Sequence, residues 1–303
     1  MKIKTLSVST YPRYNATNAS QPTAGKAIFG YGSGTSITNL VSNTGVVATD
    51  TTGVGTARSY LAAAGYGSDK AIFGYGYSST EVSITNKVSN TGVVATDTTG
   101  VGTVRMFLAA AGYGNDKAIF GYGANNAQST FYSMTNLVSN TGVVATDTTG
   151  VGTLRYLLAA AGYGTDKAIF GYGVQGGGVS NLVSNTGVVA TDIAAAGTSR
   201  YGLTAAGYGT DKAIFGYGYN NLSITNLVSN TGVIATDTTG VGTGRFYLAA
   251  AGYGSDKAIF GYGYNSAALS ITNLVSNTGV VATDTTGVGT ARNSLAAARF
   301  GGA

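Results

Sequence analysis

The residues of this chain that could do chemistry are aspartates, arginines, tyrosines and glycines, because histidine and cysteine are both absent. Their absence excludes thiolate nucleophiles, imidazole bases, disulfides and the usual soft metal ligands. One aspartate recurs in each copy of an ATD motif, at Asp50, Asp97, Asp147, Asp192, Asp237 and Asp284. Acid and base catalysis needs two carboxylates at one site, which a single aspartate per copy does not supply. We therefore predict no catalytic residues, no metal site and no cofactor, and expect each aspartate to bind a turn amide or an arginine.

The arginines and the Gly-Tyr-Gly motifs also recur once per copy. A phosphate-binding glycine loop needs a helix directly after it, and helical periodicity is missing throughout the chain. We expect both groups to be structural, with the tyrosines packed between neighbouring units and the arginines tying units together. The tyrosines are Tyr75, Tyr122, Tyr172, Tyr217 and Tyr262, and the arginines are Arg58, Arg105, Arg155, Arg200, Arg245 and Arg292.

These residues belong to a repeat built around KAIFGYG. The motif occurs six times, beginning at Lys26, Lys70, Lys117, Lys167, Lys212 and Lys257. The spacings between copies are 44, 47, 50, 45 and 45 residues, and all of the variation falls in one insert after the last glycine of the motif. Internal repetition of this period is typical of a repeat architecture rather than of two domains.

Each repeat contains four short runs with strand character. In the second copy these are 61–66, 71–75, 84–89 and 93–97, separated by turn residues, with Asn90-Thr91-Gly92 as a tight hairpin. Four-stranded units of this length predict an all-β fold, a six-bladed β-propeller of antiparallel blades. The last run, 295–300, has no second strand after it, so we expect it to close the first blade. An open β-solenoid is the alternative, although it gives no reason for this offset.

Composition and charge narrow the function. Glycine is 48 of 303 residues and charged residues are only 10%, but apolar residues return on a fixed period, which favours a folded chain. The net charge is +5 without any run of lysine or arginine, so we expect no nucleic-acid partner. No stretch is long and apolar enough for membrane insertion. Residues 1–25 lie outside the repeat and are predicted to be an attachment arm to a larger assembly, with the propeller over 26–303.

The order of motifs resembles the kelch repeat over residues 26–300. An arginine (Arg105) precedes Leu108-Ala-Ala-Ala, a turn, Lys117-Ala-Ile-Phe-Gly-Tyr-Gly, a variable loop, a strand, a hairpin and the next arginine. In that family an arginine precedes the inner strand and a glycine doublet ends the second strand. Here Gly-Tyr-Gly replaces the doublet, and the later Tyr and Trp of the family are missing. The resemblance implies a propeller of similar blades. The repeats are also similar to low-complexity propellers of bacteriophage structural proteins, which implies a virion setting.

The copies differ in two windows, the insert and the residues flanking the arginine. Antiparallel topology places both on one face of a propeller, and their Tyr, Asn, Ser and Gly content resembles an antibody paratope. The predicted ligand-binding residues are Ser59, Tyr60, Tyr77, Met106, Phe107, Asn125, Asn126, Tyr132, Tyr156, Tyr201, Tyr219, Asn220, Phe246, Tyr247 and Tyr264. Six of them, Tyr60, Phe107, Tyr156, Tyr201, Phe246 and Tyr247, are expected to ring the mouth of the channel, exposed and unimportant for stability.

Two functions of different classes fit these features. The first is a non-enzymatic binding or adhesion module on a virion or cell surface, with a glycan or protein receptor. The second is a purely structural decoration or assembly protein whose variable loops have drifted neutrally. A propeller enzyme acting on sugars is disfavoured, because histidine and paired carboxylates are missing.

Overall fold

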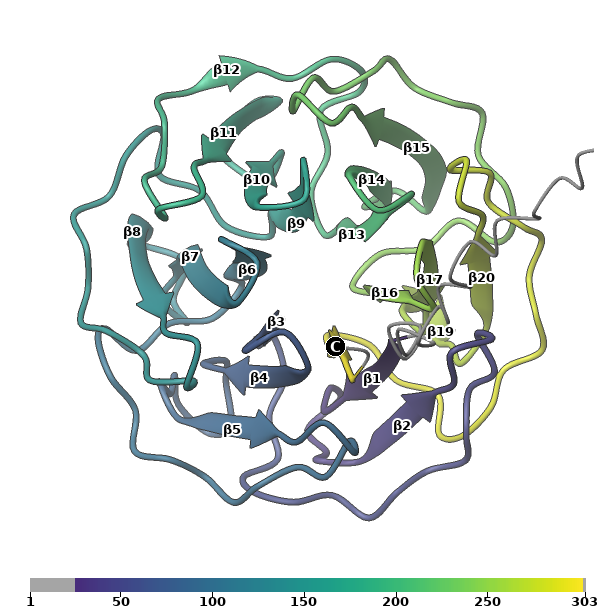
Figure 1. The fold of residues 1–303 in the computed structure, drawn as a ribbon, viewed down its shortest axis with the longest axis horizontal. Coiled ribbons are helices and arrows are strands. Elements are labelled where there is room, and N and C mark those ends of the chain that lie inside the picture. Colours follow the sequence, from purple (N-terminus) through teal and green to yellow (C-terminus); the bar gives the residue numbers. More distant parts are fainter. Residues whose placement is uncertain (1–24, 302–303) are drawn as a thin grey trace, which may run out of the picture.

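Six small antiparallel sheets stand in a ring around a central axis in the computed structural model, which describes residues 25–301 (Figure 1). Among these residues every regular element is a β-strand, so the predicted all-β class and six-bladed propeller are confirmed. No helix in this range is able to span a membrane. Of the predicted arm over 1–25, only Gly25 lies within the described residues.

Each blade has an inner, a middle and an outer strand, and we number the blades from the first middle strand onward. The inner strands of blades 1 to 6 are β21 (Ala296–Phe300), β3 (Ala62–Tyr66), β6 (Ala109–Tyr113), β9 (Ala159–Tyr163), β13 (Thr204–Tyr208) and β16 (Ala249–Tyr253). The middle strands are β1 (Lys26–Gly30), β4 (Lys70–Gly74), β7 (Lys117–Ala124), β10 (Lys167–Gly171), β14 (Lys212–Gly218) and β17 (Lys257–Gly261). The outer strands are β2 (Thr38–Val41), β5 (Thr85–Val88), β8 (Phe131–Val138), β11 (Val179–Val183), β15 (Leu222–Val228) and β20 (Thr272–Val275).

The middle strand supplies most of the core. Its Ala-Ile-Phe run is completely buried because successive side chains point to opposite faces of the sheet, and both faces meet a neighbouring blade. In blade 2, Phe73 packs with Tyr31 of blade 1, whereas Ile72 packs with Phe120 of blade 3. The inner strands carry alanines, as expected where six blades converge on one axis.

The predicted fourth strand of each blade pairs with the outer strand but is mostly too irregular to form a ladder. In blade 1, bridges join Thr38 to Thr51 and Val41 to Val47. The segment from Val47 to Thr51 is therefore one residue longer than the part of the outer strand that it opposes, Thr38 to Val41. The extra residue is a bulge that interrupts the pairing. Only blade 4 retains a short fourth strand, β12 (Ile193–Ala194). Blade 6 instead has a small hairpin within its insert, β18 (Tyr264–Asn265) and β19 (Ala267–Ala268).

The last strand closes the first blade, as predicted. β21 pairs with β1 over five residues, from Lys26 opposite Phe300 to Gly30 opposite Ala296. Arg299 stands where inner strands of the other blades have glycine, and its Nη2 donates to the carbonyl of Gly254 at 2.8 Å. A Cβ on Gly25 would lie 2.2 Å from Nε of Arg299, so a larger residue there would require the arginine side chain to move.

Candidate binding face

The two variable windows lie on one face because the main chain pairs them directly. The residue after each repeat arginine forms an antiparallel bridge or hydrogen bond with the first residue of the insert. Examples are Ser59 with Tyr77 and Phe246 with Tyr264, joined by bridges, and the amide of Tyr219, which donates to the carbonyl of Tyr201 at 2.8 Å. This pairing explains why the two windows vary together, since their side chains are neighbours. We call this surface the variable face.

The repeat arginines are buried beneath the variable face, where they bind main-chain carbonyls and asparagine side chains. Arg58 is fully buried; its Nε donates to the carbonyl of Tyr75 at 2.9 Å and its Nη2 to Oδ1 of Asn86 at 2.7 Å, both in its own blade. Its guanidinium also lies 4.3 Å from the ring centre of Tyr31 in the preceding blade. Burial lowers the pKa of Arg58, and the interactions with Tyr31 and Asp97 oppose that shift. The predicted tie between blades is confirmed in this stacking.

Arg155 in blade 4 departs from this pattern. Its Nη2 still donates to Oδ1 of Asn181, but its buried Nε and Nη1 have no hydrogen-bond partner. Its Nη1 lies 3.5 Å from Oδ1 of Asp192, an ion pair without hydrogen-bond geometry. The insert of blade 4, which begins at Val174, also contains three consecutive glycines, Gly176 to Gly178.

The repeat aspartates are structural, as predicted. Oδ2 of Asp97 accepts from the amide of Thr56 at 3.0 Å and from its hydroxyl at 2.6 Å, and Oδ1 accepts from Nδ2 of Asn86 at 2.8 Å. Burial raises the pKa of Asp97, but the hydrogen bonds from Thr56 and Asn86 and the charge of Arg58 outweigh it and hold the pKa below its usual value. Within residues 25–301 no group of three or more acidic side chains could hold a metal ion.

The framework tyrosines lie between blades, as predicted. Tyr75 is fully buried, its ring centre lies 5.2 Å from that of Phe120 in the next blade, and its hydroxyl donates to the carbonyl of Val101 at 3.0 Å. Burial raises the pKa of Tyr122 and of Tyr262 to about 12, against the opposing charges of Arg155 and Arg292.

Six residues with positive φ encircle the mouth of the channel on the variable face. Each lies two positions after a repeat arginine, and its amide donates to the carbonyl of its counterpart in the preceding blade at 2.8–3.0 Å. They are Tyr60, Phe107, Leu157, Gly202, Tyr247 and Ser294, with φ between 54° and 64°. The bonds run through all six blades and return to the first, so the channel mouth is a closed ring of main-chain hydrogen bonds.

The expectation that six aromatic residues ring this mouth is therefore correct for Tyr60, Phe107 and Tyr247 and wrong for the other three. Tyr156, Tyr201 and Phe246 come one position earlier in the repeat, where the chain pairs with the insert. These three residues are not among those that line the channel.

A chain of aromatic contacts crosses the variable face. Ring centres lie 4.4 Å apart for Tyr60 and Phe107, 5.8 Å for Phe107 and Tyr156, and 5.8 Å for Tyr60 and Tyr247. The contacts continue from Tyr247 to Phe246, with ring centres 4.7 Å apart. Phe246 in turn lies 5.3 Å from Tyr219, and Tyr219 lies 4.6 Å from Tyr201. Tyr264 also contacts Phe246, at 5.5 Å. We call these connected rings, with Phe131, the aromatic belt.

Burial differs strongly along the belt. Met106, Phe107 and Tyr156 are 3%, 7% and 9% exposed, so the expectation of an exposed ring is wrong for Phe107 and Tyr156. They pack in one cluster because the long insert of blade 3 lays Phe131 against Tyr156, with ring centres 5.0 Å apart and nearly parallel. Tyr219, by contrast, is 41% exposed. Tyr60, Tyr77, Tyr132, Tyr201, Phe246, Tyr247 and Tyr264 are half-buried.

The polar residues predicted on this face differ in what they offer a ligand. Oδ1 of Asn125 accepts from the amides of Ser129 and Thr130, so its side chain holds its own loop. The amide of Asn126 donates to the carboxylate of Glu81. Asn220 is exposed and, with φ of 66°, sits in a fixed turn beside Tyr219. Ser59 is half-buried, and its Oγ accepts from the amide of Gly34.

Sequence reasoning missed Phe131, Leu157, Val174 and Asn221 on this face. Phe131, Leu157 and Val174 pack around Tyr156 and Met106, and Asn221 follows Asn220 in the same turn. The signal for Val174 is its place as the first insert residue, which pairs with Tyr156.

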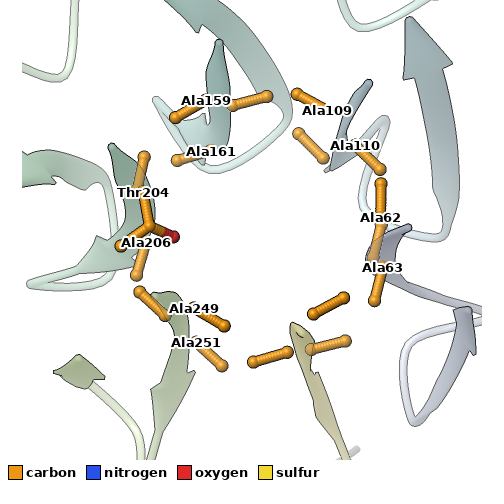
Figure 2. A pocket seen from close by; sticks show the side chains of 18 of the residues that line it. Ala62, Ala63, Ala109, Ala110, Ala159, Ala161, Thr204, Ala206, Ala249 and Ala251 are labelled. Atoms are coloured by element: carbon orange, nitrogen blue, oxygen red, sulfur yellow. The ribbon is translucent and has the colours of Figure 1, made fainter. Parts of the chain in front are cut away.

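Below the mouth, the channel is lined by the alanines of the inner strands. Figure 2 shows their methyl groups around an open centre, with Thr204 in place of one alanine. The cavity has a volume of about 210 Å³, and at one level Gly65, Gly112, Gly207 and Gly252 line it with Arg299. Its walls hold no acid–base pair among the described residues.

Comparison with protein-family models and with curated proteins finds no match to this chain. The arrangement of the candidate site therefore rests on the sequence repeats and on the geometry above.

Proposed function

We propose that this protein is a non-enzymatic binding and adhesion module whose variable face recognises a glycan or protein receptor. The observation that carries the proposal is the aromatic belt, which differs from blade to blade on a framework whose contacts repeat. Rings that pack against one another lose little conformational freedom on binding, and exposed amides beside them can adapt to a ligand. Large aromatic side chains are also the residues that most often dominate binding energy.

The proposed setting is a virion or extracellular surface, with a kelch-like repeat order and a role as a bacteriophage structural protein. Residues 1–25 would attach the propeller to a larger assembly, leaving the variable face outward. Neither a nucleic-acid partner nor membrane insertion forms part of the proposal. The channel and the aspartates support no catalytic role, because each aspartate is already used in the framework.

A purely structural decoration protein is the alternative, favoured by the repeated contacts of arginine, asparagine and aspartate in the blades. The two functions differ in what the loops do. A binding module needs its particular belt residues, whereas a decoration protein tolerates their replacement.

The test is attachment of the fluorescently labelled full chain to a panel of bacterial and animal cells. Serine stands at the ring position in blade 1, so Tyr60→Ser and Tyr247→Ser keep a residue that the ring already accommodates at this φ. We expect selective attachment by the native chain and a loss of about 1–2 kcal/mol of binding for each variant. The control is Val233→Ala, an exposed residue at the outer hairpin of blade 5. Equal attachment by all variants would replace the proposal with the structural alternative.

A further inference from the structure

We infer that the receptor is a neutral carbohydrate and that Tyr219 is the platform on which a sugar ring stacks, with Asn220 and Asn221 as its hydrogen-bonding partners. The inference rests on the proposed function and narrows it to one class of ligand and one blade. Three features of the variable face carry it.

The first feature is the separation of charge between the two ends of the blades. Within the two windows, Glu81 is the only ionisable side chain apart from tyrosines, and its carboxylate already accepts from the amide of Asn126. The repeat arginines between these windows are buried. Five of the six repeat lysines at the opposite ends pair with aspartates, as Lys212 does with Asp211 at 3.1 Å. The repeat aspartates are partly exposed, but their carboxylates are held by threonine, asparagine and the buried arginines. Two windows without free charge offer no electrostatic complementarity to a charged protein patch, sialylated glycan or sulfated glycan.

The second feature is the geometry of Tyr219. One side of its ring stacks on Tyr201, with centres 4.6 Å apart and an angle of 18°, and Phe246 packs against it at 5.3 Å. It is nevertheless the most exposed aromatic ring of the belt, at 41%. A ring fixed in this way presents a rigid apolar surface, which suits the C–H face of a pyranose without a further entropy cost.

The third feature is the pair of amides that follows. Asn220 and Asn221 both have positive φ, at 66° and 55°, in the tight turn between β14 and β15. Both residues are exposed, and no described side chain is hydrogen-bonded to either amide group. A primary amide has two donors and an acceptor, which matches the hydroxyl groups of a sugar.

The probe is an array of immobilised neutral, sialylated and sulfated glycans, read with the full chain and with Tyr219→Ala, Asn220→Ala and Val233→Ala. We expect selective binding of neutral glycans, at least about tenfold weaker for Tyr219→Ala and unchanged for Val233→Ala. Binding should change little from about 0.01 to about 1 M salt, because no ion pair forms. The melting temperature of each variant shows that it is folded.

Other outcomes overturn the inference in distinguishable ways. Binding only to sialylated or sulfated glycans, or equal binding by Tyr219→Ala, contradicts it. The same labelled chain is also applied to cells treated with periodate or with protease. Attachment that survives periodate but is lost after protease points to a protein receptor, which overturns the inference and leaves the proposed function intact. Absence of both cell attachment and array binding overturns the two together.

Discussion

Main-chain hydrogen bonds between neighbouring blades encircle both ends of the channel, but the residues that make them differ. On the variable face, six amides donate to the preceding blade from residues that include tyrosine, phenylalanine, leucine, glycine and serine. At the opposite end, which we call the lysine face, six glycines donate instead, for example Gly67 to the carbonyl of Asp116 and Gly114 to that of Asp166, both at 2.7 Å. Both rings use main-chain atoms and positive φ, yet the residue type differs among the copies only in the ring on the variable face.

Space explains the difference. A Cβ on Gly114 would lie 2.8 Å from the carbonyl oxygen of Asn185, part of the rigid hairpin of the next blade. A Cβ on Gly202, at the same kind of φ on the variable face, would meet only side-chain atoms, at 3.4 Å or more. Because the ring bonds come from the main chain and the side chains meet other side chains, which can repack, the variable face can change its residues without opening the channel. At Gly114 on the lysine face a side chain would instead meet a main-chain oxygen.

Removing the closing strand should have the largest effect on both rings. Deletion of residues 292–303 removes β21, Ser294 and the hydrogen bond from Nε of Arg292 to the carbonyl of Tyr31. The edges of blade 1 are then unpaired, so we expect aggregation or loss of cooperative unfolding, measured by light scattering and calorimetry. A chain lacking only residues 302 and 303 is the control. A monomeric deletion variant with the native melting temperature would contradict the closure described above.

The matched glycine substitutions test the comparison directly. Gly114→Ala should destabilise the protein by about 2–5 kcal/mol, from its positive φ and from the collision with a main-chain oxygen. Gly202→Ala should cost about 1 kcal/mol, because the space is open and only the φ is unfavourable. Urea unfolding of both variants measures the two values. Equal destabilisation would show that space does not separate the two faces.

Aromatic residues give a second contrast, between the framework and the exposed part of the belt. Tyr122→Ala leaves a cavity between blades and should cost about 3–5 kcal/mol, as other buried aromatic residues do. Tyr219→Ala should change stability by less than about 1 kcal/mol, since the ring is the most exposed of the belt. Tyr156→Ala should fall between them because its ring is buried under Phe131. Thermal unfolding ranks the three, and a Tyr219 variant as unstable as the Tyr122 variant would contradict the assignment.

Alkaline pH should destabilise the framework through its buried tyrosines. The folded-state pKa of Tyr122 and Tyr262 is raised to about 12, whereas a tyrosine in an unfolded chain titrates near about 10. Their contribution to stability is therefore complete below about pH 10 and is lost as the pH rises toward about 12. Urea midpoints between these two pH values should fall steadily. Tyr122→Phe should lessen that fall, and an identical fall in this variant would exclude Tyr122 as a source.

The smallest effect is expected on the lysine face. Lys212 pairs with the adjacent Asp211, and its side chain is 45% exposed, so the ion pair is screened by solvent. We expect Lys212→Ala to change stability by less than about 0.5 kcal/mol, measured by urea unfolding at low and high salt. A larger loss that disappears in salt would show that charge at this face holds the blades together.

The sequence predicted the architecture well because every local signal repeats six times. In the second copy the inner, middle and outer strands lie within one residue of their predicted bounds. Tyr75, Arg58 and Asp97 make the kinds of contact expected. The irregular pairing of the fourth strand could not be predicted in the same way. The extra residue between Val47 and Thr51 becomes apparent only when the segment is aligned with the outer strand beside it.

The candidate site was predicted in part for similar reasons. Antiparallel connections place both windows on one face, which requires only topology. Which residues line the mouth depends on a difference of one position in the repeat. Tyr247 lies two positions after its arginine and lines the channel, whereas Tyr201 lies one position after its arginine and does not. The burial of Tyr156 depends on Phe131, which belongs to the longest insert and has no counterpart in the other copies.

Repetition also creates a problem of self-recognition at the point of closure. The six KAIFG segments are identical, so neither backbone pairing nor alanine packing tells the last strand which of them is its partner. The preceding residue differs, because it is aspartate in five copies and Gly25 in the sixth. A side chain at that position would displace the guanidinium of Arg299 from its hydrogen bond to the carbonyl of Gly254. The match between Gly25 and Arg299 therefore favours pairing of the last strand with the first of six identical candidates, which helps a chain of near-copies to close in one register.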